Sequence, residues 1–135
     1  VEAYELAPDG IVKNVYPLKG NEKVIGMNML ELPERQKEAN IARKSGEYTI
    51  AGPYELKQGG TGALLLDPIY INEGNEKKFW GFSILVLNWN AFLKELNIDK
   101  LEDASYHFTV WKEHKICYFL NCQWGKKNII CMQIL

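Results

Sequence analysis

A run of small residues, GGTG at positions 59–62, has the composition of a loop that binds phosphate groups. Phosphate loops of the Walker type follow the pattern GxxxxGK[ST] and precede a helix, because the lysine and the helix N-terminus offset the phosphate charge. Here the run has no lysine and is followed by ALLLD, which is typical of a strand. The glycines therefore predict a hairpin turn rather than a nucleotide site.

Thiol and imidazole groups near the end of the chain raise two further kinds of chemistry. Cys117, Cys122 and Cys131 lie close in sequence to His107 and His114. A zinc site needs closely spaced ligand pairs, which are missing, and neither histidine lies in a recognisable nucleophile motif. An odd number of cysteines leaves at least one outside any intramolecular disulfide, so the compartment stays undecided. We predict buried free thiols, no metal and no cofactor.

Composition and charge narrow the function classes. The chain has 135 residues, enough for one globular domain, and its 16 basic and 17 acidic residues give a formal net charge of -1. Such a balance creates no broad positive field for nucleic acid or for an anionic membrane. The acidic residues are scattered over turns and helix surfaces, so we predict no catalytic site. No apolar run reaches the roughly 20 residues of a membrane-spanning helix, and we expect a soluble domain, which excision from a larger membrane protein would also produce.

Turn and strand signals predict the elements that position these residues. Pro8-Asp9-Gly10 indicates a hairpin between two apolar segments, and Pro33 and Gly46 bracket one helix of about three turns. Strand-like runs then follow as a three-stranded antiparallel meander, and a last helix is expected at NAFLKELN; the runs are EYTIAGPYEL, GALLLDPIYI and KFWGFSILVLNW. This order predicts an α+β, PAS-like antiparallel sheet of about five strands with helices packed on it.

Four segments, taken in order and at their spacing, resemble a known family: VYPLKGNEKVIGMNML, ARKSGEYTIAGPYELKQGG, ALLLDPIY and FWGFSILVLNW. They resemble the CHASE domain, an extracytoplasmic sensor found on histidine kinases and on nucleotide and diguanylate cyclases. The resemblance covers about residues 4–111, and we assign residues 1–111 to a CHASE-like sensor domain. Residues 112–135 are expected to form a strand-forming extension or the start of a second lobe.

The resemblance implies a function in signal transduction. Such a domain is two-lobed and PAS-like, stands on a long stalk helix between transmembrane segments, and controls a cytoplasmic output domain. The implied whole protein is a membrane-anchored receptor, either a diguanylate cyclase of the GGDEF type or a histidine kinase, and this domain would lie on the extracellular or periplasmic face. The implied partner is a small-molecule ligand of unknown identity, and a homodimer is compatible with this role. The alternative is a module of the same kind of receptor that binds no ligand and serves dimerisation or protein interaction.

Plant cytokinin receptors share this domain and suggest where the ligand would bind. Counted back from Gly52-Pro53, their helix aspartate corresponds to Arg35, and counted back from Pro68, their small polar strand residue corresponds to Leu66. Neither position matches the family pattern, whereas Met29 does match an apolar pocket residue. Arginine in this place would favour an anionic ligand through its planar fork of donors, either a carboxylate or a phosphate. The alternative is that Arg35 faces water on a charged helix.

Further pocket residues are expected on the strands. Tyr54 and Tyr70 can point hydroxyl groups into a cavity or pack by their rings, and Asp67 serves either as a structural corner before proline or as an acceptor at the pocket rim. Trp80 is typical of a core residue first and a ligand platform second. The predicted ligand-binding residues are Met29, Arg35, Tyr54, Leu56, Leu66, Asp67, Tyr70 and Trp80.

Overall fold

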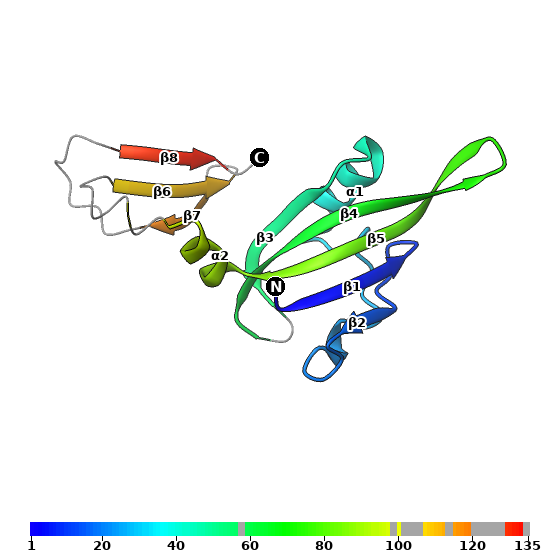
Figure 1. Ribbon diagram of the computed structural model, residues 1–135, viewed down its shortest axis with the longest axis horizontal. Helices are drawn as coiled ribbons and strands as arrows, with labels where there is room; N and C mark the ends of the chain where they lie inside the picture. The colour runs from blue at the N-terminus through cyan, green and yellow to red at the C-terminus, as the bar shows by residue number, and fades with distance from the viewer. Residues whose placement is uncertain (57–58, 98–99, 101–106, 113–114, 120–128, 134–135) are drawn as a thin grey trace. The chain divides into compact units, whose positions relative to one another are not determined.

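The computed structural model describes residues 1–56, 59–97, 100, 107–112, 115–119 and 129–133 (Figure 1). The chain divides into two compact units, Val1–Trp89 and Asn90–Leu135. The first unit contains five strands, a short 3-10 helix and the longer helix α1. Their bounds are β1 Ala3–Pro8, β2 Asn14–Tyr16, η1 Glu22–Val24, α1 Gln36–Ser45, β3 Thr49–Glu55, β4 Thr61–Glu73 and β5 Glu76–Asn88.

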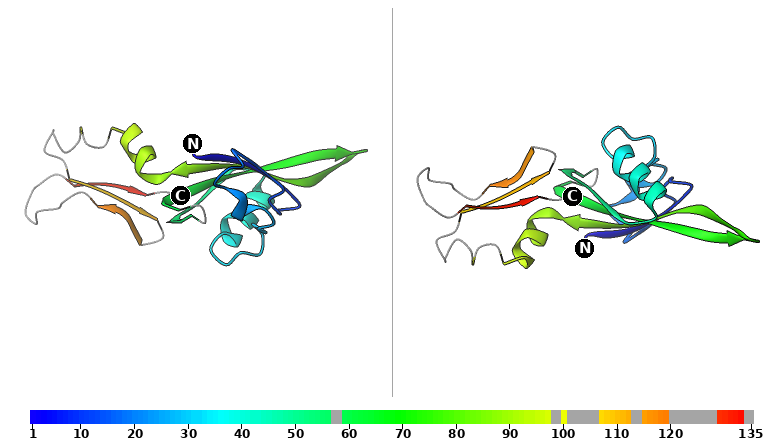
Figure 2. Two further views of the ribbon diagram at one scale, coloured as in Figure 1. Left: turned by 90° about the horizontal axis from the view of Figure 1, so that it is seen from below. Right: turned by 90° about the horizontal axis from the view of Figure 1, so that it is seen from above.

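The first unit is built on one antiparallel sheet. Its five strands lie in the order β2-β1-β5-β4-β3, so the meander β3-β4-β5 is extended by the N-terminal hairpin, whose strand β1 pairs with β5. Figure 2 shows α1 and the segment before it on one face of this sheet. The predicted α+β, PAS-like architecture with a five-stranded antiparallel sheet is confirmed.

A tight turn joins β1 to the segment that leads into β2. Asp9 and Gly10 both adopt left-handed backbone angles, with φ of 52° and 84°, and the Ile11 N–H donates to the Pro8 carbonyl at 3.0 Å. Two successive left-handed residues make the turn type that matches the twist of paired strands. The predicted hairpin is confirmed, although Pro8 ends the strand and Asp9 shares the left-handed conformation with Gly10.

Helix α1 ends where its sequence predicts and begins later. Gly46 adopts a φ of 77° and donates its N–H to the Ala42 carbonyl, which is a left-handed helix cap. The helix begins at Gln36, however, and Pro33 lies outside it. Arg35 has a non-helical φ of -129°, and its N–H donates to the Leu32 carbonyl within the preceding turn. Arg35 is therefore the residue at which the chain enters the helix.

The glycine-rich segment forms the connection between β3 and β4. Gly59 and Gly60 have left-handed φ angles of 103° and 78°, and the Gly59 N–H donates to the Leu56 carbonyl at 2.9 Å. Strand β4 begins at Thr61 and pairs antiparallel with β3. The prediction of a turn between antiparallel strands, with no helix beginning at Gly62, is confirmed.

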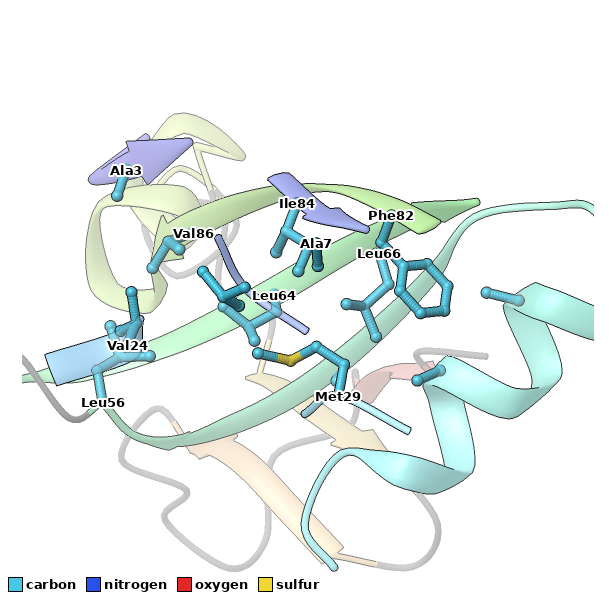
Figure 3. Packing of buried hydrophobic residues seen from close by; sticks show 14 residues of the cluster. Ala3, Ala7, Val24, Met29, Leu56, Leu64, Leu66, Phe82, Ile84 and Val86 are labelled. Atoms are coloured by element: carbon cyan, nitrogen blue, oxygen red, sulfur yellow. The ribbon is translucent and has the colours of Figure 1, made fainter. Parts of the chain in front are cut away.

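The core lies between the covered face of the sheet and α1. Figure 3 shows Met29 projecting from the segment before α1 toward Leu64 and Leu66 of β4. The buried hydrophobic cluster consists of Ala3, Ala7, Val12, Val24, Met29, Ala39, Ala42, Ala51, Leu56, Leu64, Leu66, Phe82, Ile84 and Val86. Five of its fourteen members are alanines, so much of this cluster is made of short side chains.

Strand β1 directs two alanines and one glutamate toward the core. Ala3, Glu5 and Ala7 are buried, whereas Tyr4 is 54% exposed and Leu6 is 42% exposed on the alternate positions. Because successive side chains of a strand point to opposite faces, this pairing places a carboxyl group inside and two large apolar groups outside. The interior of the domain therefore receives an ionisable side chain from its N-terminal strand.

The second unit contains a three-stranded sheet. Helix α2, Trp89–Glu95, crosses the boundary between the units and matches the helix expected at NAFLKELN; the strands are β6 His107–Lys112, β7 Lys115–Phe119 and β8 Ile129–Gln133. Strand β6 pairs antiparallel with β7 and parallel with β8. His114 and Cys122, which figure in the zinc hypothesis, lie outside the described residues. Among the described residues, no helix has both the length and the apolar character needed to cross a membrane.

Candidate functional site

Arg35 lies inside the domain. Its side chain is 3% exposed, so the alternative in which it faces water is wrong. Its Nη1 atom lies 3.8 Å from the sulfur of Met29 and 4.0 Å from the sulfur of Met27, and its Cζ atom lies 5.0 Å from the ring centroid of Tyr54. Thioether sulfur is a weak acceptor, and an aromatic face attracts a cation without accepting a conventional hydrogen bond. The guanidinium therefore contacts two sulfur atoms and a ring face, and these provide no strong hydrogen-bond acceptor for its N–H groups.

Glu5 brings a carboxyl group to the same interior. It is 3% exposed and is paired with Ile84 of β5, which in turn is paired with Leu66 of β4. These three residues make one row across the covered face of the sheet. Its neighbours on that face of β1, Ala3 and Ala7, are buried and carry short side chains.

Burial and the neighbouring charge set the ionisation of this group. Removal from water disfavours the carboxylate and raises the pKa of Glu5 from its ordinary value of 4.5 to about 7, while the Arg35 charge acts in the opposite direction. Burial likewise raises the pKa of Tyr54 above its usual range, and the Arg35 charge again opposes the shift. Because the Arg35 charge acts on the pKa of both Glu5 and Tyr54, the three residues form one interacting group.

Three polar atoms of this group lack partners. Among the described residues, no hydrogen bond reaches Glu5 Oε2, Arg35 Nε or the Tyr54 hydroxyl, although each of these atoms is buried. An unsatisfied buried polar atom costs about 1–3 kcal/mol, and more when the group is charged. We call Glu5, Arg35 and Tyr54 the interior polar cluster. Its unpaired atoms include both hydrogen-bond donors and acceptors, as a binding site for a small polar molecule requires.

The chemistry of the cluster is binding chemistry. A carboxyl group, a guanidinium and a phenol can orient a ligand, and the cluster contains no nucleophile next to a base. Within the described part of the chain, no group of three or more histidine, cysteine, aspartate or glutamate residues is arranged to hold a metal ion.

Four of the predicted ligand-binding residues lie in or next to the interior between sheet and helix. Met29 and Leu66 are buried in the core cluster, Arg35 contacts Met29, and the Tyr54 ring packs against the core and against Arg35. Sequence reasoning missed Glu5 and Met27. No sequence signal pointed to Glu5, because the alternation in Ala3–Pro8 would place Tyr4 and Leu6 inside.

Of the other four predicted residues, Leu56 also belongs to the buried core, whereas Asp67, Tyr70 and Trp80 lie outside the core cluster. Asp67 is exposed, on the face of β4 opposite to that of Leu66. Tyr70 donates its hydroxyl to the Arg43 carbonyl and packs edge-on against Phe79. Trp80 is half-buried, next to an irregularity in the pairing of β4 with β5.

Leu56 is buried in the core and also lines a separate cavity on the surface. That cavity has a volume of about 330 Å³ and is lined largely by polar residues and glycines, including Lys19, Asn21, Gly59 and Gly60. It lies at the turn between β3 and β4. Neither Arg35 nor Tyr54 lines this cavity, so it is separate from the interior polar cluster.

Comparison with solved structures supports the fold. The chain resembles an extracellular ligand binding receptor from Desulfohalobium retbaense DSM5692, with a TM-score of 0.59 and 17% sequence identity. The match covers 93% of this chain and 22% of that one, so the chain spans about a fifth of the receptor's length. At this identity the likeness concerns the fold alone. No curated protein sequence gives a significant match.

Comparison with protein families is more specific. The family model of the CHASE domain matches residues 7–115, which is most of the chain. The match includes Arg35 and Tyr54 together with the sheet strands from β3 to β5. The resemblance that the sequence motifs indicated is confirmed. The chain belongs to the CHASE domain family, and it is a sensory domain.

Proposed function

We propose that this chain is the extracytoplasmic ligand-binding part of a membrane-anchored receptor, and that it recognises a small molecule bearing a carboxylate or phosphate next to Arg35. Membership of the CHASE family supports the sensory role. In the whole protein, signal transduction would run across the membrane to a cytoplasmic diguanylate cyclase or histidine kinase. The chain itself would carry no enzymatic activity.

The observation that carries the proposal is the set of unpaired polar atoms inside the domain. Glu5 Oε2, Arg35 Nε and the Tyr54 hydroxyl are buried without hydrogen-bond partners among the described residues. A ligand that supplies partners for them would recover the free energy lost by burying them, since hydrogen bonds to charged groups contribute roughly 1.5–3 kcal/mol. The surrounding apolar wall, with Met29 and Leu66, would exclude water from those bonds.

Binding measurements test the proposal. Isothermal calorimetry with a panel of small carboxylates and phosphates should detect a ligand for the wild-type domain, and Arg35→Ala should weaken its binding about tenfold to hundredfold. Arg43→Ala is the matched control, because Arg43 is an exposed arginine of α1 whose Cζ lies 5.9 Å from the Phe79 ring centroid. Leu66→Trp should block the site by filling it. Equal affinity in wild type and Arg35→Ala would refute the anion role, and unchanged affinity in Leu66→Trp would place the site elsewhere.

A second candidate function is self-association without a ligand. Tyr4, Leu6 and Tyr16 carry large exposed apolar groups around a shallow surface cavity of about 350 Å³, which Glu5 also lines. Such side chains favour a protein contact. Sedimentation velocity of wild type and of the variant Tyr4→Ser with Leu6→Ser tests this role: a concentration-dependent dimer that the variant loses, combined with no ligand in calorimetry, would favour the interaction module.

A further inference from the structure

Two opposite charges approach the interior from different elements. Glu5 comes from β1 on the sheet, and Arg35 comes from the turn that leads into α1. Both side chains are 97% buried, being 3% exposed. Charged groups buried to this extent are stable only when paired or hydrogen-bonded.

The two groups do not satisfy one another fully. Glu5 Oε2 accepts no hydrogen bond and Arg35 Nε donates none among the described residues, so these atoms do not join in a two-pronged ion pair. The Nη1 atom of Arg35 faces two methionine sulfurs instead of a carboxylate oxygen. An arginine and a glutamate that existed only to stabilise the fold would gain most by closing that pair.

The unpaired atoms of Glu5 and Arg35 require hydrogen-bond partners of opposite kinds. Glu5 Oε2 requires a hydrogen-bond donor, and a cationic donor such as an ammonium group gives the strongest bond to it. Arg35 Nε requires an acceptor, and a carboxylate fits its planar fork. The Tyr54 hydroxyl can donate or accept. Apolar side chains adjoin these groups: Met29 contacts Arg35, and Leu66 lies in the same row across the sheet as Glu5.

We infer that the interior polar cluster takes a zwitterionic ligand of the amino-acid class, whose ammonium group bonds Glu5, whose carboxylate bonds Arg35, and whose apolar body packs against Met29 and Leu66. This inference rests on the proposed ligand-binding function and narrows its ligand from an anion to a zwitterion. A ligand of this kind satisfies both buried charges at once. An anion alone would leave the carboxylate form of Glu5 without a donor, and an amine alone would leave Arg35 without an acceptor.

A set of three matched probes tests the inference on the wild-type domain. L-leucine carries both charges, 4-methylpentanoate lacks the amine, and 3-methylbutylamine lacks the carboxylate. By calorimetry, L-leucine or L-phenylalanine should bind at least about tenfold more tightly than either single-charge probe. Equal affinity for L-leucine and 4-methylpentanoate would overturn the zwitterion while leaving the anion sensor of the proposed function intact. Absence of binding by every probe and by the anion panel would overturn both.

Variants assign the two ends of the ligand. Glu5→Gln should reduce the affinity for L-leucine to about that for 4-methylpentanoate, and Arg35→Met should reduce it to about that for 3-methylbutylamine. Glu2→Gln, which changes an exposed carboxylate next to β1, should leave the affinity unchanged. Circular dichroism checks that each variant folds. Retention of full affinity by folded Glu5→Gln would overturn the role of Glu5.

Proton exchange provides a readout that needs no variant. At pH 7 the carboxyl group of Glu5 is partly protonated, because burial raises its pKa to about 7. An ammonium group bound beside it favours the carboxylate, so L-leucine should release protons on binding. The heat measured in two buffers of different ionisation enthalpy reports this release. Proton uptake on L-leucine binding would contradict an ammonium group at Glu5.

Discussion

The guanidinium of Arg35 lies over the ring of Tyr54, with 5.0 Å between Cζ and the ring centroid. This contact joins the turn before α1 to strand β3, two segments that approach one another only in the folded domain. The face of the ring contacts the cation, while the hydroxyl group has no hydrogen-bond partner among the residues that the structure describes. Tyr54 therefore stabilises the fold through its ring, while its hydroxyl group is available to bond a ligand.

Replacing Tyr54 separates these two contributions. Tyr54→Phe keeps the ring and removes an unpaired hydroxyl, so the free energy of unfolding without ligand should stay the same or rise by about 1 kcal/mol. Tyr54→Leu also removes the cation–π contact and should lower it by about 1–2 kcal/mol or more. Urea denaturation followed by fluorescence measures both. A loss of stability in Tyr54→Phe would mean that the hydroxyl has a hydrogen-bond partner in solution.

Stability should depend on pH through Glu5. The folded domain holds the Glu5 proton up to about pH 7, whereas the unfolded chain releases it near pH 4.5. Between these values the folded state binds more protons, so the free energy of unfolding should fall as the pH rises. The contribution of the Glu5 proton to the free energy of unfolding is complete below pH 4.5 and lost above pH 7. It amounts to about 3 kcal/mol.

Glu5→Gln provides the comparison for the pH prediction. Glutamine does not ionise, so the fall in stability between pH 4.5 and pH 7 should be absent or much smaller in this variant. Denaturant unfolding at several pH values gives the two profiles. Parallel profiles for wild type and Glu5→Gln would show that another group is responsible.

Gly81 should tolerate no side chain. Its φ is 156°, and a Cβ atom there would collide with backbone atoms of Ala7 and Pro8 on the neighbouring strand. Gly81→Ala should therefore destabilise the domain by about 1–3 kcal/mol or more. Gly74 is the control position: it is left-handed but surrounded by open space, and Gly74→Asn should cost only a few tenths of a kcal/mol. Thermal unfolding distinguishes the two, and a stable Gly81→Ala would contradict the close approach of β1 and β5.

Tyr70 should anchor the end of α1 to the sheet. Its hydroxyl donates to the Arg43 carbonyl, a contact between residues 27 positions apart. Tyr70→Phe should keep the packing against Phe79 and lower the stability by about 0.5–1.5 kcal/mol, with faster amide hydrogen exchange in the last turn of α1. Tyr48→Phe, at an exposed tyrosine just after the helix, should change neither measurement. Unchanged exchange in Tyr70→Phe would show that the hydrogen bond does not hold the helix end.

Local signals predicted the elements because each depends on a few neighbouring residues. Asp9-Gly10 forms a left-handed turn, Gly46 caps α1, and Gly59-Gly60 turns the chain between β3 and β4. Backbone angles of this kind follow from glycine and aspartate chemistry within four or five residues. The start of α1 was less predictable, since Pro33 fits a first helical turn and the chain instead makes one more turn before Gln36.

The candidate site was harder to predict, since burial in a sheet is decided by partners far along the chain. In the strand Ala3–Pro8, alternation by size would place Tyr4 and Leu6 inside and Glu5 outside. Pairing with β5 reverses this, because Glu5 lies opposite Ile84 on the covered face. Arg35 was placed by family resemblance, while its burial depends on Met29 and Tyr54, which only the folded chain brings to it.

The two outer strands of the five-stranded sheet are irregular, and this bears on how the domain behaves at high concentration. Strand β2 has three residues and is followed by Pro17, and β3 is interrupted between Ala51 and Tyr54, where Pro53 has no N–H to donate. Exposed edges with long rows of free backbone groups are templates on which strands of other chains add. Neither edge of this sheet offers such a row. Growth into fibrils through the edges of this five-stranded sheet is therefore expected to be slow even in concentrated solution.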